Sequence, residues 1–233
     1  MNYKNTIRGI FKDRPNRFIA HVQIGDQLET VHVKNTGRCR ELLVPGAEVI
    51  LEKSGNPRRS TLYDLIGVWK GTRLINIDSQ APNKVFHEWV QEGHLFTRVA
   101  LIKPEYRYKS SRLDFYIEAE DKKILVEVKG VTLEEDGVVM FPDAPTQRGV
   151  RHLHELADAV REGYTAYFFF IVQMKDVLYF TPNYKTHEEF GKVLQEAQEA
   201  GVHIMALDCV VTENSITAGE PVEVKIDPKE RVE

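Results

Sequence analysis

Two carboxylates and a lysine lie on neighbouring strand-like stretches of this sequence. Asp114 precedes a short polar turn, and Glu127 and Lys129 follow it. Side chains of a strand alternate between the two faces of a sheet, so Glu127 and Lys129 project together, while Val126 and Val128 project to the opposite side. Burying such charges beside apolar strands costs free energy unless they are compensated. A bound divalent cation would compensate them.

The register of the predicted hairpin decides which of these charges face each other. A turn at residues 121–122 places Asp114 opposite Lys129, whereas a turn at residues 120–121 places Asp114 opposite Glu127. Either register keeps the three charges on one face, and a slip of one residue would separate them.

The donor atoms of this group suit a hard cation. Asp114, Glu127 and the main-chain carbonyl of Val128 offer oxygen ligands of the kind that Mg²⁺ or Mn²⁺ prefers. Lys129 would lie beside the water shell of the cation, where it could orient or deprotonate a water that attacks a phosphodiester. The pattern therefore predicts a phosphodiesterase centre, and a cross-strand salt bridge on a solvated face is the alternative.

A helix predicted over residues 147–162 carries a second polar group. Arg148, His152 and Glu155 share one face through their i, i+4 and i+7 spacing, apart from the apolar stripe. Thr146 can cap this helix, and Arg148 in the first turn opposes the helix dipole. We expect Thr146, Arg148 and His152 to contact an incoming phosphate, with an exposed polar face as the alternative.

The elements that must position these residues change character near residue 80. Five short segments, rich in β-branched and aromatic residues and separated by turn signals, are predicted as strands: 6–11, 17–22, 30–33, 48–52 and 62–68. Such strands favour a small closed barrel over residues 1–80. Residues 81–233 read as helix, hairpin, helix, buried strand, helix and strand, which indicates an α/β layer structure. Residues 222–226 could form a further strand that returns to the first domain.

The two parts also differ in charge. The 233 residues have a net charge of −4, yet residues 1–80 carry 13 basic against 8 acidic side chains, which leaves 18 basic and 27 acidic residues for the remainder. A basic first part is compatible with binding a polyanion.

The turns of the barrel supply the candidate contacts to nucleic acid. We predict that role for Arg14, Arg17, Asn35, Thr36, Arg38, Arg40, Arg58 and Arg59. The glycine turn within residues 34–40 could let backbone N–H groups approach phosphate. Phe18 and Tyr63 are candidates for base stacking, but each suits the barrel core equally well. No base-reading helix is recognisable, so we expect largely sequence-independent binding through the nucleic-acid backbone.

Composition argues against other classes of protein. The longest apolar run, residues 164–172, is far shorter than the ~20 residues that cross a bilayer. The opening residues lack the apolar core of a signal peptide, so we expect a cytoplasmic protein without membrane contact. Cys39 and Cys209 lie 170 positions apart and suggest two reduced thiols, with neither a disulfide partner nor a zinc site.

Several motifs in a fixed order resemble one known family. They are Asn35-Thr36-Gly37-Arg38, Pro45-Gly46, Asn83-Lys84-Val85-Phe86-His87-Glu88, Arg112-Leu113-Asp114-Phe115, Val126-Glu127-Val128-Lys129-Gly130-Val131-Thr132-Leu133, and Met140-Phe141-Pro142-Asp143-Ala144-Pro145-Thr146-Gln147-Arg148-Gly149 with His152-Leu153 and Glu155-Leu156. Nearly end to end, the chain resembles the sugar fermentation stimulation protein A family.

This resemblance implies an N-terminal OB-like five-stranded barrel followed by a PD-(D/E)XK nuclease-like α/β domain. It matches Asp114 to the aspartate of the nuclease motif, Glu127 to its second acid and Lys129 to its lysine. Glu88 stands where such nucleases often place an extra metal-binding carboxylate, and Leu113 replaces the proline of the motif.

The family is described as DNA-binding and has been linked to the regulation of sugar (maltose) utilisation genes. Two readings of the function stay open on this basis. The protein is either a DNA-binding protein with a working Mg²⁺-dependent centre, or a non-enzymatic transcriptional regulator built on an inactive nuclease fold. Single-stranded and double-stranded DNA are equally compatible with the sequence, and it leaves the oligomeric state open.

Overall fold

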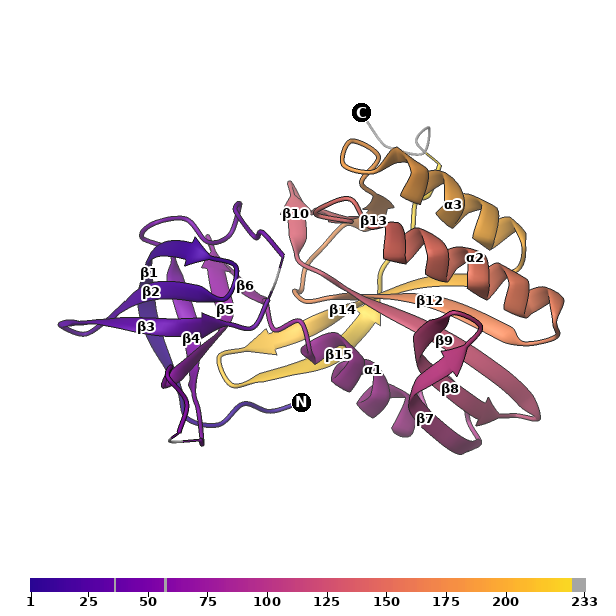
Figure 1. Ribbon diagram of the computed structural model, residues 1–233, viewed down its shortest axis with the longest axis horizontal. Helices are drawn as coiled ribbons and strands as arrows, with labels where there is room; N and C mark the ends of the chain where they lie inside the picture. Colours follow the sequence, from indigo (N-terminus) through magenta and orange to yellow (C-terminus); the bar gives the residue numbers. More distant parts are fainter. Residues whose placement is uncertain (36, 57, 228–233) are drawn as a thin grey trace.

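The protein consists of a β-barrel joined to an α/β domain (Figure 1). The computed structural model describes residues 1–35, 37–56 and 58–227. Thr36, one of the predicted contacts to nucleic acid, lies outside the described residues.

The barrel is formed by the first strands of the chain. They are β1 (Thr6–Asn16), β2 (Ile19–Ile24), β3 (Gln27–Val33), β4 (Glu48–Lys53), β5 (Tyr63–Lys70) and β6 (Arg73–Asn76). The strand order is β3-β2-β1-β4-β5-β6, and a parallel pairing of His32 with Asp64 and of Val33 with Leu65 joins β3 to β5. This pairing closes the five strands that the sequence predicts into a barrel. The short β6 is added to the sheet as the antiparallel neighbour of β5.

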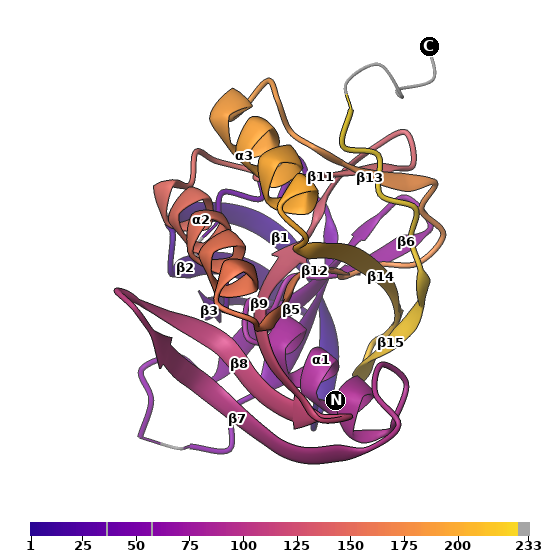
Figure 2. The same cartoon turned by 90° about the vertical axis from the view of Figure 1, so that its right-hand side faces the viewer.

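The second part has three layers. Its elements are α1 (Ala81–Gln91), β7 (Val99–Tyr108), β8 (Ser111–Ala119), β9 (Lys122–Val131), β10 (Leu133–Glu135), β11 (Val138–Phe141), α2 (Gln147–Arg161), β12 (Thr165–Val172), β13 (Tyr179–Pro182), α3 (Glu188–Glu199), β14 (His203–Thr212) and β15 (Ser215–Pro221). The main sheet has the order β15-β14-β12-β9-β8-β7, and β9, β12 and β14 run parallel. Helices α2 and α3 cover one face of this sheet and α1 covers the other (Figures 1 and 2). An α/β domain after the barrel is therefore confirmed.

A tight hairpin between β8 and β9 sets the register at the predicted centre. Ala119 pairs with Lys122 and Phe115 pairs with Val126, so the loop consists of Glu120 and Asp121. Both loop residues have positive φ, 53° and 62°, as a type I′ turn requires. Continuing this register brings Asp114 level with Glu127, so the alternative register, with Asp114 opposite Lys129, is wrong.

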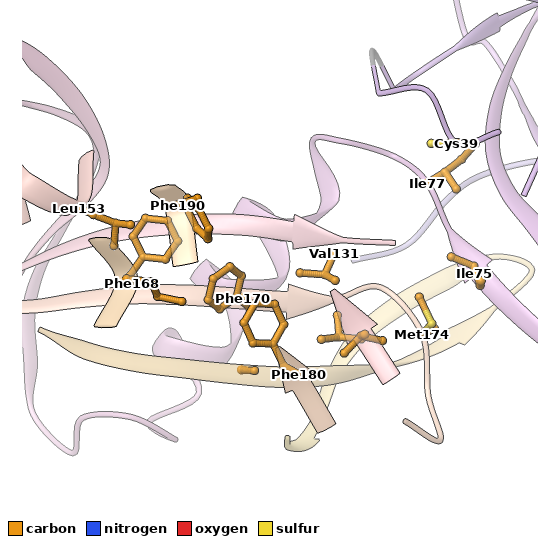
Figure 3. Close-up of a cluster of buried hydrophobic side chains, with 14 of the residues drawn as sticks. Cys39, Ile75, Ile77, Val131, Leu153, Phe168, Phe170, Met174, Phe180 and Phe190 are labelled. Atoms are coloured by element: carbon orange, nitrogen blue, oxygen red, sulfur yellow. The ribbon is translucent and has the colours of Figure 1, made fainter. Parts of the chain in front are cut away.

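The two parts of the protein share their hydrophobic cores. Figure 3 shows one buried cluster that spans both parts. It contains Ile75 on β6 and Ile77 directly after β6, and continues through Met174 to Phe170 and Phe180 of the α/β domain. A second cluster joins barrel residues such as Ile50, Ile66 and Leu74 to α1, β14 and β15. Because apolar contacts are continuous on both sides of the sheet, the barrel and the sheet are held in one relative position.

The end of the described chain stays with the α/β domain. Val224 forms a bridge with Phe180 of β13, and the N–H of Lys225 donates to the Phe180 carbonyl at 2.9 Å. The prediction that residues 222–226 return to the barrel is therefore wrong. Helices α1, α2 and α3 of the described chain all lack the length and apolar character that a bilayer crossing requires.

Candidate active site and nucleic-acid surface

Asp114 lies on β8 beside the point where the ladder to β9 ends. Its Oδ2 accepts a hydrogen bond of 2.8 Å from the N–H of Val128, and its Oδ1 accepts one of 2.9 Å from the side-chain amide of Asn83 on α1. Burial raises the pKa of Asp114, and the nearby charge of Glu127 raises it further. Two donors thus fix a carboxylate whose charge is costly without further compensation.

Glu127 is the most enclosed acid of the group, with 1% of its surface exposed. Its Oε1 accepts a hydrogen bond from Nζ of Lys129 and lies 2.5 Å from Nδ1 of His152. Its buried Oε2, by contrast, has no hydrogen-bond partner among the described residues. Burial by itself raises the pKa of Glu127, but the contacts with His152 and Lys129 outweigh it and the net shift is downward. Glu127 is therefore held as a carboxylate with one oxygen available for another ligand.

Lys129 lies beside the Glu127 carboxylate and is partly open to solvent. Its side chain is 18% exposed, and Nζ lies 5.9 Å from the centre of the Phe168 ring. The next residue, Gly130, lines a hollow of about 280 Å³ between the barrel and the α/β domain. The lysine is thus paired with a buried carboxylate while its side chain keeps some access to solvent.

The first turns of α2 pack against Glu127. One of the three residues predicted here to contact phosphate, His152, has a different role. Thr146 caps the helix by accepting the N–H of Gly149 at 3.1 Å, as expected. Arg148 is exposed, and its Nε lies 3.4 Å from Nε2 of His152. His152 is only 1% exposed and faces Glu127. A direct contact of His152 with nucleic acid is therefore excluded by burial, and the residue instead positions Glu127.

Glu88 does not join the other carboxylates. It is exposed on α1, and its carboxylate lies 2.5 Å from the amino group of Met1, which also binds the carbonyl of Ile216 in β15. Asn83 and His87, by contrast, lie on the side of α1 that contacts Asp114 and Phe115 of β8. The assignment of Glu88 as a metal ligand is therefore wrong, because its carboxylate faces β15.

The remaining donors suit a hard divalent cation. Within the described ranges, no group of three or more His, Cys, Asp or Glu side chains is arranged to hold a metal ion. Asp114 and Glu127 nevertheless provide two carboxylates on adjacent strands, and Oε2 of Glu127 is a buried oxygen to which no described residue donates. Two carboxylates completed by a main-chain carbonyl and waters form a common Mg²⁺ donor set.

The basic residues of the barrel fall into two groups. The guanidinium group of Arg14 donates to the carbonyls of Arg17, Asn35, Gly37 and Arg38 at 2.6–2.9 Å. Arg59 forms a two-pronged ion pair with Asp64 at 2.6 and 2.8 Å. The guanidinium groups of Arg14 and Arg59 therefore make their hydrogen bonds within the barrel and stabilise its loops. Arg17, Arg38, Arg40 and Arg58 are exposed, and Asn35 accepts the N–H of Gly37 at 2.7 Å.

Asn83 is a site residue that the sequence analysis did not select. It is 31 positions from Asp114 and comes from a helix on the other side of the hairpin, so no spacing rule links the two. Its place in the family motif at residues 83–88 and in the first turn of α1, directly after the buried Pro82, were the available signals.

Comparison with known proteins supports one family for the whole chain. Residues 13–77 match the model of the SfsA N-terminal OB domain, and residues 80–215 match that of the sugar fermentation stimulation protein RE domain. The sugar fermentation stimulation protein homolog of Ruminiclostridium cellulolyticum is 58% identical over 97% of this chain and 100% of its own length. That of Desulfitobacterium hafniense DCB-2 is 60% identical over 97% and 99%.

A solved structure agrees with these sequence matches. It is described as Pyrococcus furiosus SfsA in complex with Ca²⁺, is 32% identical, and covers 97% of this chain and 98% of its own with a TM-score of 0.88. The chain therefore belongs to the sugar fermentation stimulation protein family.

Proposed function

We propose that this protein binds DNA and hydrolyses phosphodiester bonds at a divalent-cation centre formed by Asp114 and Glu127. The observation that carries the proposal is the buried Oε2 of Glu127, which has no hydrogen-bond partner among the described residues and lies on the strand next to the carboxylate of Asp114. A buried charged oxygen of this kind is costly unless a ligand binds it. The Ca²⁺ named for the solved Pyrococcus relative supports a divalent ion.

In this proposal each residue has a distinct task. Asp114, Glu127 and the carbonyl of Val128 hold Mg²⁺ or Mn²⁺, which when bound neutralises charge on the reacting phosphate. Asn83 and the N–H of Val128 keep Asp114 in one orientation. His152 and Lys129 keep Glu127 ionised, and Lys129 can orient the attacking water from its partly open position.

Contacts to DNA in this proposal come mainly from exposed cations. Arg17, Arg38, Arg40 and Arg58 lie on the barrel, and Arg148 lies at the start of α2. Phosphate contacts by such residues give binding with little sequence preference that weakens steeply with salt. Each of these arginines adds to affinity without selecting a base.

Two observations favour the alternative of a non-enzymatic regulator. Lys129 is already ion-paired with Glu127, and a third acidic or histidine ligand does not accompany the two carboxylates among the described residues. A protein of this kind would bind DNA with the same salt dependence and would not turn it over.

A cleavage assay on single-stranded and duplex DNA with Mg²⁺ and with Mn²⁺ separates the two functions. We expect cleavage by the wild type and a loss of about 100-fold or more in Glu127→Gln and Lys129→Ala. Glu155→Gln is the matched control, because Glu155 is also a buried acid with one oxygen unpartnered among the described residues, but it lies on α2, where its other oxygen accepts the hydroxyl of Ser110 at 2.6 Å, outside the β8–β9 pair.

The outcomes of this assay are distinct. Equal cleavage by Glu127→Gln and wild type would remove the proposed centre. DNA binding without cleavage in either metal would support the regulator. A protein that binds no DNA at low salt would remove both functions. Thermal unfolding with and without Ca²⁺ gives a second readout, because a cation that binds only the folded state raises the melting temperature of the wild type and not of Glu127→Gln.

A further inference from the structure

Two hollows meet at the segment that links the barrel to α1. The barrel hollow, of about 450 Å³, is lined by Phe18, His32, Val33, Lys34, Arg59, Asp64, Ser79 and Gln80. The α1 hollow, of about 480 Å³, is lined by Asn83, Lys84, His87, Pro104, Glu105, Asp114 and Phe115 together with the same Ser79 and Gln80. Because Ser79 and Gln80 lie in the walls of both, the two hollows adjoin each other at the linker.

Phe18 presents an aromatic ring at the far end of this path. Its side chain is 49% exposed, in contrast to the phenylalanines of the core. The turn that carries it is fixed, because the Phe18 N–H donates to Oδ1 of Asn16 at 2.9 Å and its carbonyl accepts the N–H of Val33 at 2.8 Å. The guanidinium group of Arg17 lies 5.3 Å from the centre of the ring. An exposed ring on a turn with a fixed backbone, beside a cation, offers a planar base a stacking surface and the adjoining phosphate a charged partner.

The charges along the path favour a polyanion. The acidic Asp64 is neutralised by the fork of Arg59, and His32 Nδ1 lies 2.8 Å from the same carboxylate. In the α1 hollow, the exposed Glu105 lies 3.4 Å from Arg112. Lys84 on the exposed face of α1 adds positive charge close to Asn83. Asp64 and Glu105 are thus compensated, and Asp114 is left as the acid that the proposed cation would neutralise.

We propose that the two hollows form one track for a single-stranded nucleic acid, in which an unpaired base stacks on Phe18 and the strand crosses Ser79 and Gln80 to reach Asp114. This inference rests on the proposed function, and it adds the strandedness of the substrate and a base-binding subsite. The bases of a duplex already stack on one another, so only an unpaired base can place its face on the Phe18 ring.

Fluorescence anisotropy with one labelled oligonucleotide, single-stranded or annealed to its complement, tests the subsite. We expect Phe18→Ala to weaken single-strand binding about 5- to 100-fold and to leave duplex binding unchanged. Phe18→Tyr keeps the ring and should retain single-strand affinity. Leu28→Ala is the matched control, because Leu28 is 60% exposed on β3 but does not line the barrel hollow.

A length series tests whether the hollows are connected. In the wild type, affinity should rise with oligonucleotide length until both hollows are filled. Gln80→Trp, which places a bulky ring at the shared wall, should make the affinity level off at a shorter length. If affinity rises with oligonucleotide length to the same extent in the wild type and in Gln80→Trp, a continuous track is contradicted.

These results also separate this inference from the proposed function. If Phe18→Ala binds and cleaves as the wild type does, the track is wrong while DNA binding and cleavage stand. If single strands bind normally through Phe18 but no variant or metal gives cleavage, the track stands without the phosphodiesterase. If no oligonucleotide binds at low salt, both are overturned.

Discussion

Arginines of this protein that look alike in the sequence perform different tasks in the structure. Arg14 donates to four main-chain carbonyls of the neighbouring loops, whereas Arg38 on one of those loops is exposed. A guanidinium group satisfies several carbonyls at once because its donors form a rigid, planar fork. Arg14 therefore shapes the surface on which Arg38 and Arg40 are presented.

Replacing Arg14 should affect stability more than direct binding. We expect Arg14→Ala to lower the free energy of unfolding by about 2 kcal/mol, because several carbonyls lose a charged donor. Arg14→Lys should recover less than half of this loss, since an ammonium cannot reproduce the fork. Urea denaturation measures both changes.

The control for Arg14 is Arg38→Ala. It should leave stability within about 0.5 kcal/mol of the wild type and reduce the salt slope of DNA binding by about one phosphate contact. If Arg14→Ala is as stable as Arg38→Ala, the internal role of Arg14 is wrong.

The sequence allowed the alignment of Asp114 with Glu127 to be predicted as one of two registers, because strand periodicity fixes which side chains share a face. It did not allow the role of His152 to be predicted. Helical spacing groups His152 with Arg148, but only the packing of α2 on the sheet buries one and exposes the other. The same holds for Phe18, whose hydrophobicity gave no sign of whether it faces core or solvent.

Among the elements, the β8–β9 hairpin has the greatest influence on the site. Its two-residue loop forces positive φ on Glu120 and Asp121, a conformation that costs a non-glycine residue free energy. The turn was foreseen only as one of two possibilities, because neither loop contains the Asn-Gly or Asp-Gly pair that would have specified it.

Substitutions at the second loop position should show this cost. We expect Asp121→Gly to raise the free energy of unfolding by about 0.5–1 kcal/mol, because glycine adopts positive φ without steric strain. Asp121→Ala removes the same charge and should give no gain, since alanine tolerates this conformation less well than aspartate. Urea midpoints of the two variants decide the point, and equal stability would show that charge rather than backbone conformation matters here.

Strand β7 was missed by the sequence analysis for a physical reason. It is an edge strand with Pro104 in the middle, so its apolar run stops at Ile102 and the mostly exposed residues 103–108 show no strong alternation. Edge strands tolerate proline because one side of the strand needs no hydrogen-bond partner. The buried strands β9 and β12, by contrast, were recognisable from their apolar composition.

At the scale of the whole molecule, one buried acid links the barrel to the α/β domain. Glu134 of β10 lies 2.7 Å from Lys70 and 2.8 Å from Arg73, both of which belong to the β5–β6 hairpin. Burial raises the pKa of Glu134, but the hydrogen bond from Lys70 and the contacts of Gly137 and Arg73 outweigh it, so the net pKa lies below the ordinary value of 4.5.

This ion-pair group should make stability sensitive to acid. A carboxyl group with a lowered pKa contributes its full stabilisation at neutral pH and loses it as the pH falls through the folded-state value. We expect Glu134→Gln to lower the free energy of unfolding at pH 7 by about 3 kcal/mol and to flatten its decline below pH 5. Exposed Glu135 provides the control variant Glu135→Gln, which should match the wild type in urea unfolding at pH 7 and pH 4.

The continuous cores described above make the barrel an unsuitable portable module. Cut off after the linker, it would present Ile50, Ile66 and Leu74 on one flank, and Ile75 and Ile77 on another, to water. Fusing the isolated barrel to an unrelated protein would therefore require polar redesign of both flanks, and a fusion without that redesign would be prone to self-association.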